Sequence, residues 1–260
     1  MSSESTSRIY TEIKGAAAHV IIENPAKLNS LSFDMWDSLP AHLSKADNDP
    51  DIKVIIVQGA GIKAFASGSD ISQFGERRNT PEGVALYNAT VDRAVKALGA
   101  VSKPTLARVN GYCFGGGLAL AIHCDLRYAS EGATFCIPAA KVGLGYNALW
   151  LARLTWLVGP ANAKEIMYTA AQYTAADALR MGLINRIHDD AEFTTLVDKI
   201  CSLAPLTHVA SKVAIDEASS SHDIDMERCN EAIATCFASA DYVEGRSAFS
   251  EKRKPVFAGR

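Results

Sequence analysis

The sequence predicts an α/β fold with one main domain and a helical C-terminal third. Segments typical of buried strands alternate with amphipathic helical segments between residues 18 and 129, and this alternation is typical of an α/β architecture. From Leu149 onward the pattern is almost entirely helical. The chain has 260 residues, 48% of them hydrophobic, which is enough to bury one sizeable core.

Short apolar runs predict the strands. Residues 18–22 end at the turn signal Asn24-Pro25, and residues 54–57 are β-branched and uninterrupted, as expected of a strand covered on both faces. Residues 104–109 and 126–129 are two further predicted strands. Residues 59–68, which separate two of these elements, are expected to form a loop.

The helices between these strands are predicted from apolar side chains at helical spacing. Residues 32–46 form the first, with Ser32 or Asp34 near its N-cap. Pro40 lies inside this helix and is expected to break or bend it, because proline lacks the N–H that the helix needs. Residues 81–98 and 115–123 are predicted to form the next two helices.

The C-terminal third consists mostly of predicted helices, with one strand at residues 183–187. A helical layer that follows an α/β core is typical of a packing or oligomerisation region. The predicted helices are residues 161–168, 175–181, 191–203, 206–218 and 225–238.

Composition and charge exclude several classes of protein. With 26 basic and 29 acidic residues, the formal charge of -3 gives no general attraction to nucleic acid or an anionic membrane. Six cysteines occur, but no C-x-x-C pair suggests a zinc or redox site. Residues 1–7 are polar, unlike a signal peptide, and no apolar run is long enough to span a bilayer. We therefore expect a cytoplasmic protein with reduced cysteines.

Two glycine-containing turns, residues 64–71 and 110–120, each follow a predicted strand and precede helical sequence. Gly115-Gly116-Gly117 leads into an apolar helix, whose first turn has unpaired N–H groups and the positive end of the helix dipole. Glycines let a developing oxyanion approach such N–H groups, and two of them from different turns would form an oxyanion hole. The alternative is that these glycines only allow helices to pack closely on strands.

Neither turn matches a nucleotide-binding motif. The G-x-G-x-x-G spacing is absent, and no Gly-Lys-Ser/Thr follows the glycines. Dinucleotide sites and phosphate loops of those types are therefore disfavoured.

Several motifs in the same order resemble the enoyl-CoA hydratase/isomerase (crotonase) superfamily, over essentially the whole chain. The segments that carry the resemblance are residues 24–31, 64–71, 110–120, 124–129, 175–185 and 249–255. The resemblance implies a spiral of repeated ββα units, with residues 1–200 as the core that holds the acyl-CoA site. Residues 201–260 would form a helical region that covers CoA and assembles the chain into homotrimers or hexamers.

The resemblance also implies the site. The oxyanion donors would be the N–H groups of Ser69 and Gly116, and CoA would enter as part of the substrate, with no metal or redox cofactor. Ala66, Ser67 and Gly68 would lie along the CoA adenine and pantetheine. The other residues expected to contact substrate or CoA are Lys27, Leu28, Asp70, Ile71, Gly115, Ala119, Ala139 and Asn147, together with Phe249 and Lys252, which resemble residues that reach the CoA of a neighbouring subunit.

The chain departs from the family's hydratase pattern at its acid/base groups. A hydratase of this family uses two glutamates to hold and activate water, and this chain has Ala119 and Ala139 in their places. Losing one acid/base group typically costs a factor of roughly 10² to 10⁴ in rate. By the same resemblance, Asn147 stands where the family's isomerases carry their glutamate. Efficient hydration by the ordinary mechanism is therefore not expected.

An oxyanion hole without a base can still support decarboxylation, because loss of carbon dioxide forms the enolate directly. Residues 138–147 resemble the corresponding segment of the family's methylmalonyl-CoA decarboxylases, in which a tyrosine at the position of Tyr146 orients the carboxylate. The match is partial, because those enzymes carry a histidine where this chain has Ser69. Tyr146 would either bond the substrate or pack beneath CoA.

Two other functions stay open. One is an atypical hydratase that uses Tyr146, His123 or Glu76, and the other is a non-catalytic acyl-CoA-binding protein. His123 is expected to be a packed, hydrogen-bonded residue. Glu76, Arg77 and Arg78 lie in a loop expected to be mobile over the acyl pocket, where solvated charge is favoured and contact of one of them with substrate is the alternative. Asp70 and Asp125 are expected to act as turn or cap residues. The basic segment 252–254 is expected to contact CoA phosphate.

Overall fold

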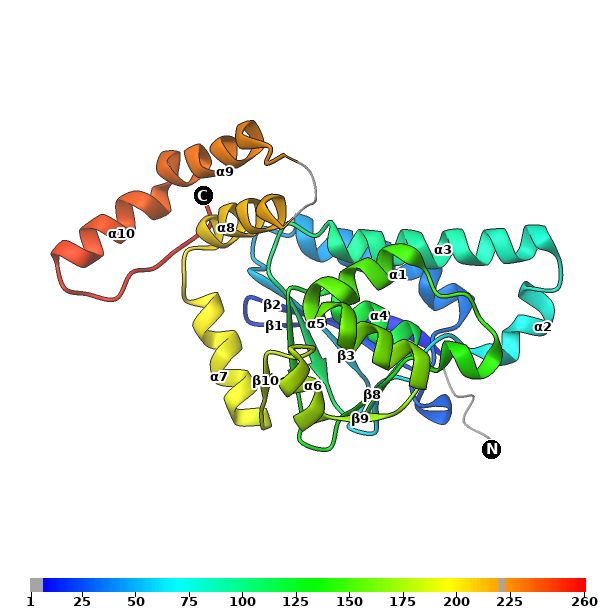
Figure 1. The fold of residues 1–260 in the computed structure, drawn as a ribbon. Coiled ribbons are helices and arrows are strands. Elements are labelled where there is room, and N and C mark those ends of the chain that lie inside the picture. The colour runs from blue at the N-terminus through cyan, green and yellow to red at the C-terminus, as the bar shows by residue number, and fades with distance from the viewer. Residues whose placement is uncertain (1–6, 220–222) are drawn as a thin grey trace, which may run out of the picture.

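The computed structural model describes residues 7–219 and 223–260, and the described chain folds into two sheets surrounded by helices (Figure 1). The polar segment before residue 7 lies outside the described residues. None of the helices in the described ranges has the length and apolar character needed to cross a bilayer.

The larger sheet has six strands in the order β1-β2-β3-β5-β7-β10. The first two strands pair antiparallel, and every other neighbouring pair is parallel. Strands β2 and β3 are buried along most of their length, as their apolar sequences predict. The bounds are β1 Arg8–Lys14, β2 Ala17–Glu23, β3 Val54–Gly59, β5 Thr105–Val109, β7 Leu126–Ala129 and β10 Arg186–Ile187.

The smaller sheet has the order β4-β6-β8-β9, and its first three strands are parallel. Consecutive strands enter different sheets: β3, β5 and β7 belong to the larger sheet, and β4, β6 and β8 to the smaller one. A helix then follows each pair, so the predicted spiral of ββα units is confirmed. The bounds are β4 Ala64–Ala66, β6 Tyr112–Phe114, β8 Thr134–Cys136 and β9 Tyr173–Thr174.

The helices of the main body bury apolar stripes against these sheets. Trp36 and Leu39 of α1 are fully buried, as are Ala94 and Leu98 of α3, which packs on α1. Truncating a large buried side chain such as Leu39 or Leu98 to alanine typically costs about 2–5 kcal/mol. The bounds are α1 Phe33–Asn48, α2 Phe74–Arg77, α3 Pro81–Gly99, α4 Gly116–His123, α5 Ala148–Thr169 and α6 Ala175–Met181, with short 3-10 turns η1 Pro25–Lys27, η2 Ile71–Gln73 and η3 Pro138–Val142.

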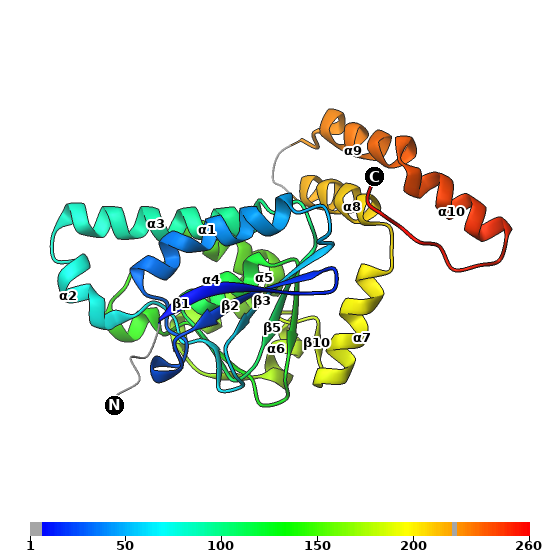
Figure 2. The same ribbon diagram turned by 180° about the vertical axis from the view of Figure 1, so that it is seen from behind.

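The C-terminal third is helical, as predicted. Figures 1 and 2 both show α9 and α10 standing away from the two sheets, with α8 between them and the main body. The bounds are α7 Asp190–Cys201, α8 Pro205–Ala218, α9 Met226–Ala238 and α10 Ala240–Ser250.

Several local predictions need correction. Of the break or bend expected at Pro40, a break does not occur: α1 continues through the proline, because buried side chains on both sides of it anchor one continuous helix. The segment expected to be a loop contains β4, whose hydrogen bonds to β6 are long-range and therefore leave no local signal. The predicted strand at 183–187 shortens to Arg186–Ile187.

Helix α5 begins before the predicted start at residue 161. It is interrupted at Gly159, whose φ of 76° is not helical, and Pro160 then starts its second half. The predicted helix is therefore only this second half, and residues 148–158 form another helical segment before the kink. Helix α10 was also not predicted.

Candidate active site

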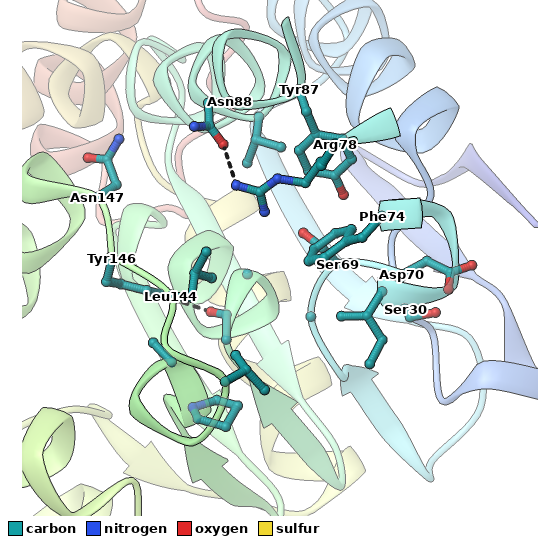
Figure 3. Close-up of a pocket in the computed structure, with 18 of the residues that line it drawn as sticks. Ser30, Ser69, Asp70, Phe74, Arg78, Tyr87, Asn88, Leu144, Tyr146 and Asn147 are labelled. Carbon is teal, nitrogen blue, oxygen red and sulfur yellow. Dashed lines mark hydrogen bonds between the residues drawn. The ribbon is translucent and has the colours of Figure 1, made fainter. Parts of the chain in front are cut away.

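Three turns of the smaller sheet converge on one cavity. They follow the carboxyl ends of β4, β6 and β8, which lie at the same edge because these strands are parallel. The cavity has a volume of about 590 Å³. Figure 3 shows its wall residues, which come from these turns, from α2 and α3, and from the segment before α5. Polar and apolar groups that are distant in sequence therefore share one space.

Two backbone donors of these turns are unpaired. Within the described chain, neither the N–H of Ser69 nor that of Gly116 donates a hydrogen bond to a protein acceptor. The turns approach closely: a Cβ on Gly116 would lie 3.5 Å from the Ser69 nitrogen, and a Cβ on Gly68 would lie 3.5 Å from the Gly116 nitrogen. Two unpaired N–H groups beside one cavity are suited to bind an oxyanion.

The turn that carries Ser69 is held by the segment before α1. The N–H of Leu31 donates to the Gly68 carbonyl at 2.8 Å, and the N–H of Asp70 donates to the Leu31 carbonyl at 2.8 Å. Ser69 lies between these two bonds and its own N–H stays available. Gly68 has a φ of 108°, a value that favours glycine at this point.

Tyr146 holds the other donor peptide. Its hydroxyl donates to the Gly115 carbonyl at 3.0 Å, and that carbonyl belongs to the same peptide group as the Gly116 N–H. The Tyr146 ring packs edge-on against Trp150, with centroids 5.4 Å apart, and burial raises the pKa of the phenol. The single proton of the hydroxyl is engaged, so in this conformation Tyr146 positions the donor peptide.

Lys27, Asp70 and Ser72 form a polar network at one wall. Lys27 Nζ lies 2.7 Å from Asp70 Oδ2, and the hydroxyl of Ser72 donates to Asp70 Oδ1 at 2.7 Å. Although burial acts to raise the pKa of Asp70, these hydrogen bonds hold it below its usual value. Asp70 also caps η2, which confirms its predicted capping role.

Arg78 lines the cavity, so for this residue the structure supports the alternative to the favoured prediction of solvated charge. Its Nη2 donates to Asn88 Oδ1 at 3.1 Å, and its guanidinium lies over the rings of Phe74 and Tyr87, 4.7 and 5.2 Å from their centroids (Figure 3). No carboxylate of the described chain pairs with it. Glu76 and Arg77, its neighbours in the same loop, do not line the cavity.

Asp92 is a carboxylate of the cavity wall that the sequence did not indicate. It accepts a hydrogen bond of 2.8 Å from Asn147 Nδ2, while the Asn147 side-chain oxygen caps α5. Residues Asn88 and Asp92 are four apart on α3, so both face the cavity. Their spacing was visible in the sequence, but nothing local indicated which helix face the cavity would occupy.

The structure brings most of the predicted site residues together. His123 lies outside the cavity wall, where its Nδ1 is 2.7 Å from the Ala119 carbonyl oxygen, which confirms a packed, hydrogen-bonded histidine. Asp125 is also outside and pairs with Lys212 at 2.9 Å. Predicted residues that line the cavity are Lys27, Ser67, Gly68, Ser69, Asp70, Ile71, Gly115, Gly116, Ala139, Tyr146 and Asn147.

The other predicted substrate contacts do not line this cavity. Ala66 and Ala119 are fully buried in the core, Leu28 is partly exposed beside Ser67, and Phe249 and Lys252 are exposed at the end of α10. Ala119 faces the core because it lies within α4, whose residues from Gly117 to Ile122 are all buried. Ala119, which stands in place of one hydratase glutamate, is therefore surrounded by other core residues and does not face the cavity.

The sequence model of the family described as enoyl-CoA hydratase/isomerase matches residues 12–260. The chain belongs to the enoyl-CoA hydratase/isomerase family. The short-chain-enoyl-CoA hydratase of Clostridium acetobutylicum is 34% identical over 252 residues, covering 95% of each chain. The peroxisomal Delta(3,5)-Delta(2,4)-dienoyl-CoA isomerase of Arabidopsis thaliana is 32% identical, covering 92% of each chain.

Solved structures of the enoyl-CoA hydratase/isomerase family have the same fold. A crystal structure of an enoyl-CoA hydratase/carnithine racemase from Magnetospirillum magneticum superposes with a TM-score of 0.92 at 32% identity, covering 100% of this chain and 97% of that one. An enoyl-CoA hydratase/isomerase family protein from Hyphomonas neptunium gives 0.91 at 32% identity, covering 97% and 98%. As a member of this family, the chain is an enzyme that acts on acyl-CoA.

Proposed function

We propose that this enzyme stabilises a thioester enolate between the N–H groups of Ser69 and Gly116, and that the enolate forms when a carboxylated acyl-CoA loses carbon dioxide. The observation that carries the proposal is that two unpaired backbone donors share a cavity with Arg78, a cation without a carboxylate partner in the described chain. The uncharged acyl group of an enoyl-CoA would give Arg78 no counter-charge.

The step needs no base to start it. As the bond between Cα and the carboxylate breaks, its electron pair moves into the thioester, carbon dioxide leaves, and the carbonyl oxygen becomes an enolate oxygen. Removing one donor of such an oxyanion hole typically lowers kcat by roughly 10² to 10³. The enolate then takes a proton at Cα. CoA enters with the substrate, and the step uses no other cofactor.

The walls of the cavity suit a carboxylate that must be partly desolvated. Ile137, Leu144 and Trp150 provide apolar surface. Figure 3 shows Leu144 and Arg78 on separate walls of the cavity. Apolar surface destabilises the carboxylate relative to uncharged carbon dioxide, whereas the arginine attracts the substrate into the site.

The test is mass spectrometry of a mixed acyl-CoA panel incubated with the purified enzyme. The panel holds crotonyl, malonyl, methylmalonyl and ethylmalonyl thioesters, and the variant Gly116→Ala is the matched control against contaminating host enzymes. Loss of carbon dioxide from a malonyl-type thioester, reduced in the variant, supports the proposal. Ligand-induced stabilisation without any product would instead indicate an acyl-CoA-binding protein.

Hydration is the second candidate, and Asp92 is the observation that favours it. This carboxylate lines the cavity and could act as general base if water is held between it and an enoyl-CoA. Asp92→Asn should then abolish hydration of crotonyl-CoA. If the enzyme decarboxylates, the same variant should keep most of its carbon dioxide release.

We also propose that α9 and α10 form a contact with other copies of the chain, as trimers or hexamers. This pair of helices stands away from the main body and exposes large apolar side chains (Figures 1 and 2). Phe237, Val243 and Phe249 are 61%, 63% and 88% exposed. Light scattering on the purified protein tests this proposal, and a monomer at micromolar concentration would contradict it. In such an assembly Phe249 and Lys252 would reach the CoA of a neighbouring copy.

A further inference from the structure

Tyr87 places a buried, unpaired hydroxyl at the wall of the cavity. The side chain is 2% exposed, and its oxygen has no hydrogen-bond partner of normal geometry. Its ring is fixed by Phe33 and Phe74, with centroids 5.8 and 5.5 Å away. Figure 3 shows the hydroxyl on the side of the ring that faces Ser69. A buried hydroxyl without a partner is destabilising, so its retention calls for a functional reason.

Three groups beside this hydroxyl would stabilise the phenolate that forms when its proton is transferred. The indole Nε1 of Trp36 is also buried and unpaired, and an indole N–H can only donate. Arg78 lies over the Tyr87 ring, 5.2 Å from its centroid. Burial raises the pKa of Tyr87, while the neighbouring Ser69, Arg78 and Trp36 act to lower it. These three groups would stabilise a transient phenolate.

The other polar groups of the wall are already engaged. The hydroxyl of Tyr146 donates to Gly115, Asp92 accepts from Asn147, and Asp70 is paired with Lys27. The side chain of Ser69 lies beside Tyr87 and acts to lower the pKa of its phenol, but a serine alkoxide is far more basic than a tyrosine phenolate. Tyr87 is therefore the wall residue best suited to give up a proton beside the oxyanion donors.

We propose that Tyr87 is the catalytic acid that protonates the enolate at its α-carbon, an inference that rests on the proposed binding of the thioester at Ser69 and Gly116. The bond between the phenol oxygen and its proton breaks, and a bond forms between that proton and Cα. The product is a saturated thioester and a phenolate. Water that enters after product release returns a proton to the phenolate.

The variant Tyr87→Phe tests the proposal with methylmalonyl-CoA in D₂O. Wild-type enzyme should yield propionyl-CoA with deuterium at C2 in one configuration. The variant should turn over more slowly, by a factor of roughly 10² to 10⁴, and should give a racemic C2 because solvent then supplies the deuteron. Since the hydroxyl is unpaired, the variant should unfold at the same or a higher temperature than wild type. Tyr10→Phe, on the edge strand β1, is the matched control and should behave as wild type.

A second measurement separates this proposal from the proposed decarboxylation. Propionyl-CoA has no carboxylate to lose, but its C2 hydrogens exchange with D₂O if the Tyr87 phenolate removes them. This exchange should become faster as the pH rises above the ordinary tyrosine value of about 10, because burial raises the pKa of this phenol. If wild type accelerates this exchange and Tyr87→Phe does not, the result supports Tyr87 as the catalytic acid, even if no malonyl-type thioester reacts. Exchange equal in both proteins, or retained stereochemistry in the variant, would overturn it.

Discussion

The hydroxyl of Tyr146 donates a hydrogen bond of 3.0 Å to the carbonyl of Gly115, on the opposite side of the peptide group whose N–H belongs to Gly116. The N–H of Ala119 donates to the same carbonyl at 3.0 Å. These two bonds fix the plane of the donor peptide, and they polarise it so that its N–H becomes a better donor. Tyr146 therefore supports the oxyanion hole by binding the carbonyl side of its donor peptide.

The first prediction concerns Tyr146→Phe. Loss of one neutral hydrogen bond, worth about 1 kcal/mol, should lower kcat by about five- to tenfold for every thioester that reacts, with little change in KM. Steady-state kinetics on two thioesters of different charge measure this. A rise in KM confined to carboxylated thioesters would show instead that Tyr146 binds the substrate carboxylate. Tyr168→Phe, on the exposed face of α5, is the control.

Gly116→Ala should block the oxyanion hole while leaving the fold intact. The backbone there is not left-handed, but the methyl group would lie 3.0 Å from the Trp36 ring and 3.5 Å from the Ser69 nitrogen, where the substrate oxygen must bind. We expect kcat to fall by roughly 10² to 10³. The comparison is Gly132→Ala, since a methyl there has no atom within 4 Å. Equal activity of the two variants would remove Gly116 from the site.

Arg78→Met should weaken the binding of carboxylated acyl-CoA by about tenfold or more, because a charge-assisted hydrogen bond is lost. Binding of neutral acyl-CoA should hardly change. Calorimetry with malonyl-CoA and butyryl-CoA gives the two affinities. Arg77→Met makes the same change of charge at a residue that lies over the Phe33 ring, outside the cavity wall, and should preserve both. A loss of free CoA binding in Arg78→Met would mean that the arginine contacts a phosphate.

Asp70 should stabilise the folded protein at neutral pH, and this stabilisation should be lost in acid. Its pKa is lowered in the folded protein, so its contribution is fully present above the ordinary pKa of about 4 and is lost as the pH falls through the lower, folded value. Urea unfolding at pH 7 should show Asp70→Asn to be less stable than wild type by about 1 kcal/mol or less, since Lys27 is half exposed. This difference should shrink as the pH is lowered below about 4. A difference that is independent of pH would contradict the ion pair.

Much of the fold could be predicted from local patterns. The strand at 126–129 and the helix at 175–181 have the predicted bounds, because apolar periodicity and caps fix them. Strand β4 and the first half of α5 could not be predicted. Strand β4 is only three residues long and depends on pairing with β6. The first half of α5 lies between a loop and the kink at Gly159.

The site divides in the same way. The glycine turns at Gly68 and Gly115 can be recognised in the sequence, because backbone N–H groups can be approached closely only where a Cβ is missing. Arg78 and Asp92 could not be assigned to the site from the sequence, since charged residues on a loop or a helix are normally expected to face solvent. Their place in the wall depends on how α3 packs on α1, α2 and α4.

By itself, the sequence determined the α/β class and the two glycine turns, because these follow from short-range periodicity and from where glycine stands. The order of its motifs carried the resemblance to the enoyl-CoA hydratase/isomerase family, and that resemblance implied Ser69 and Gly116 as the donors. Only the tertiary structure decided that Tyr146 holds the Gly115–Gly116 peptide, that Ala119 is packed in the core, and that Tyr87 has an unpaired hydroxyl. Each of these depends on which atoms meet across long stretches of chain, and side-chain direction in the folded core has no signature in a local pattern.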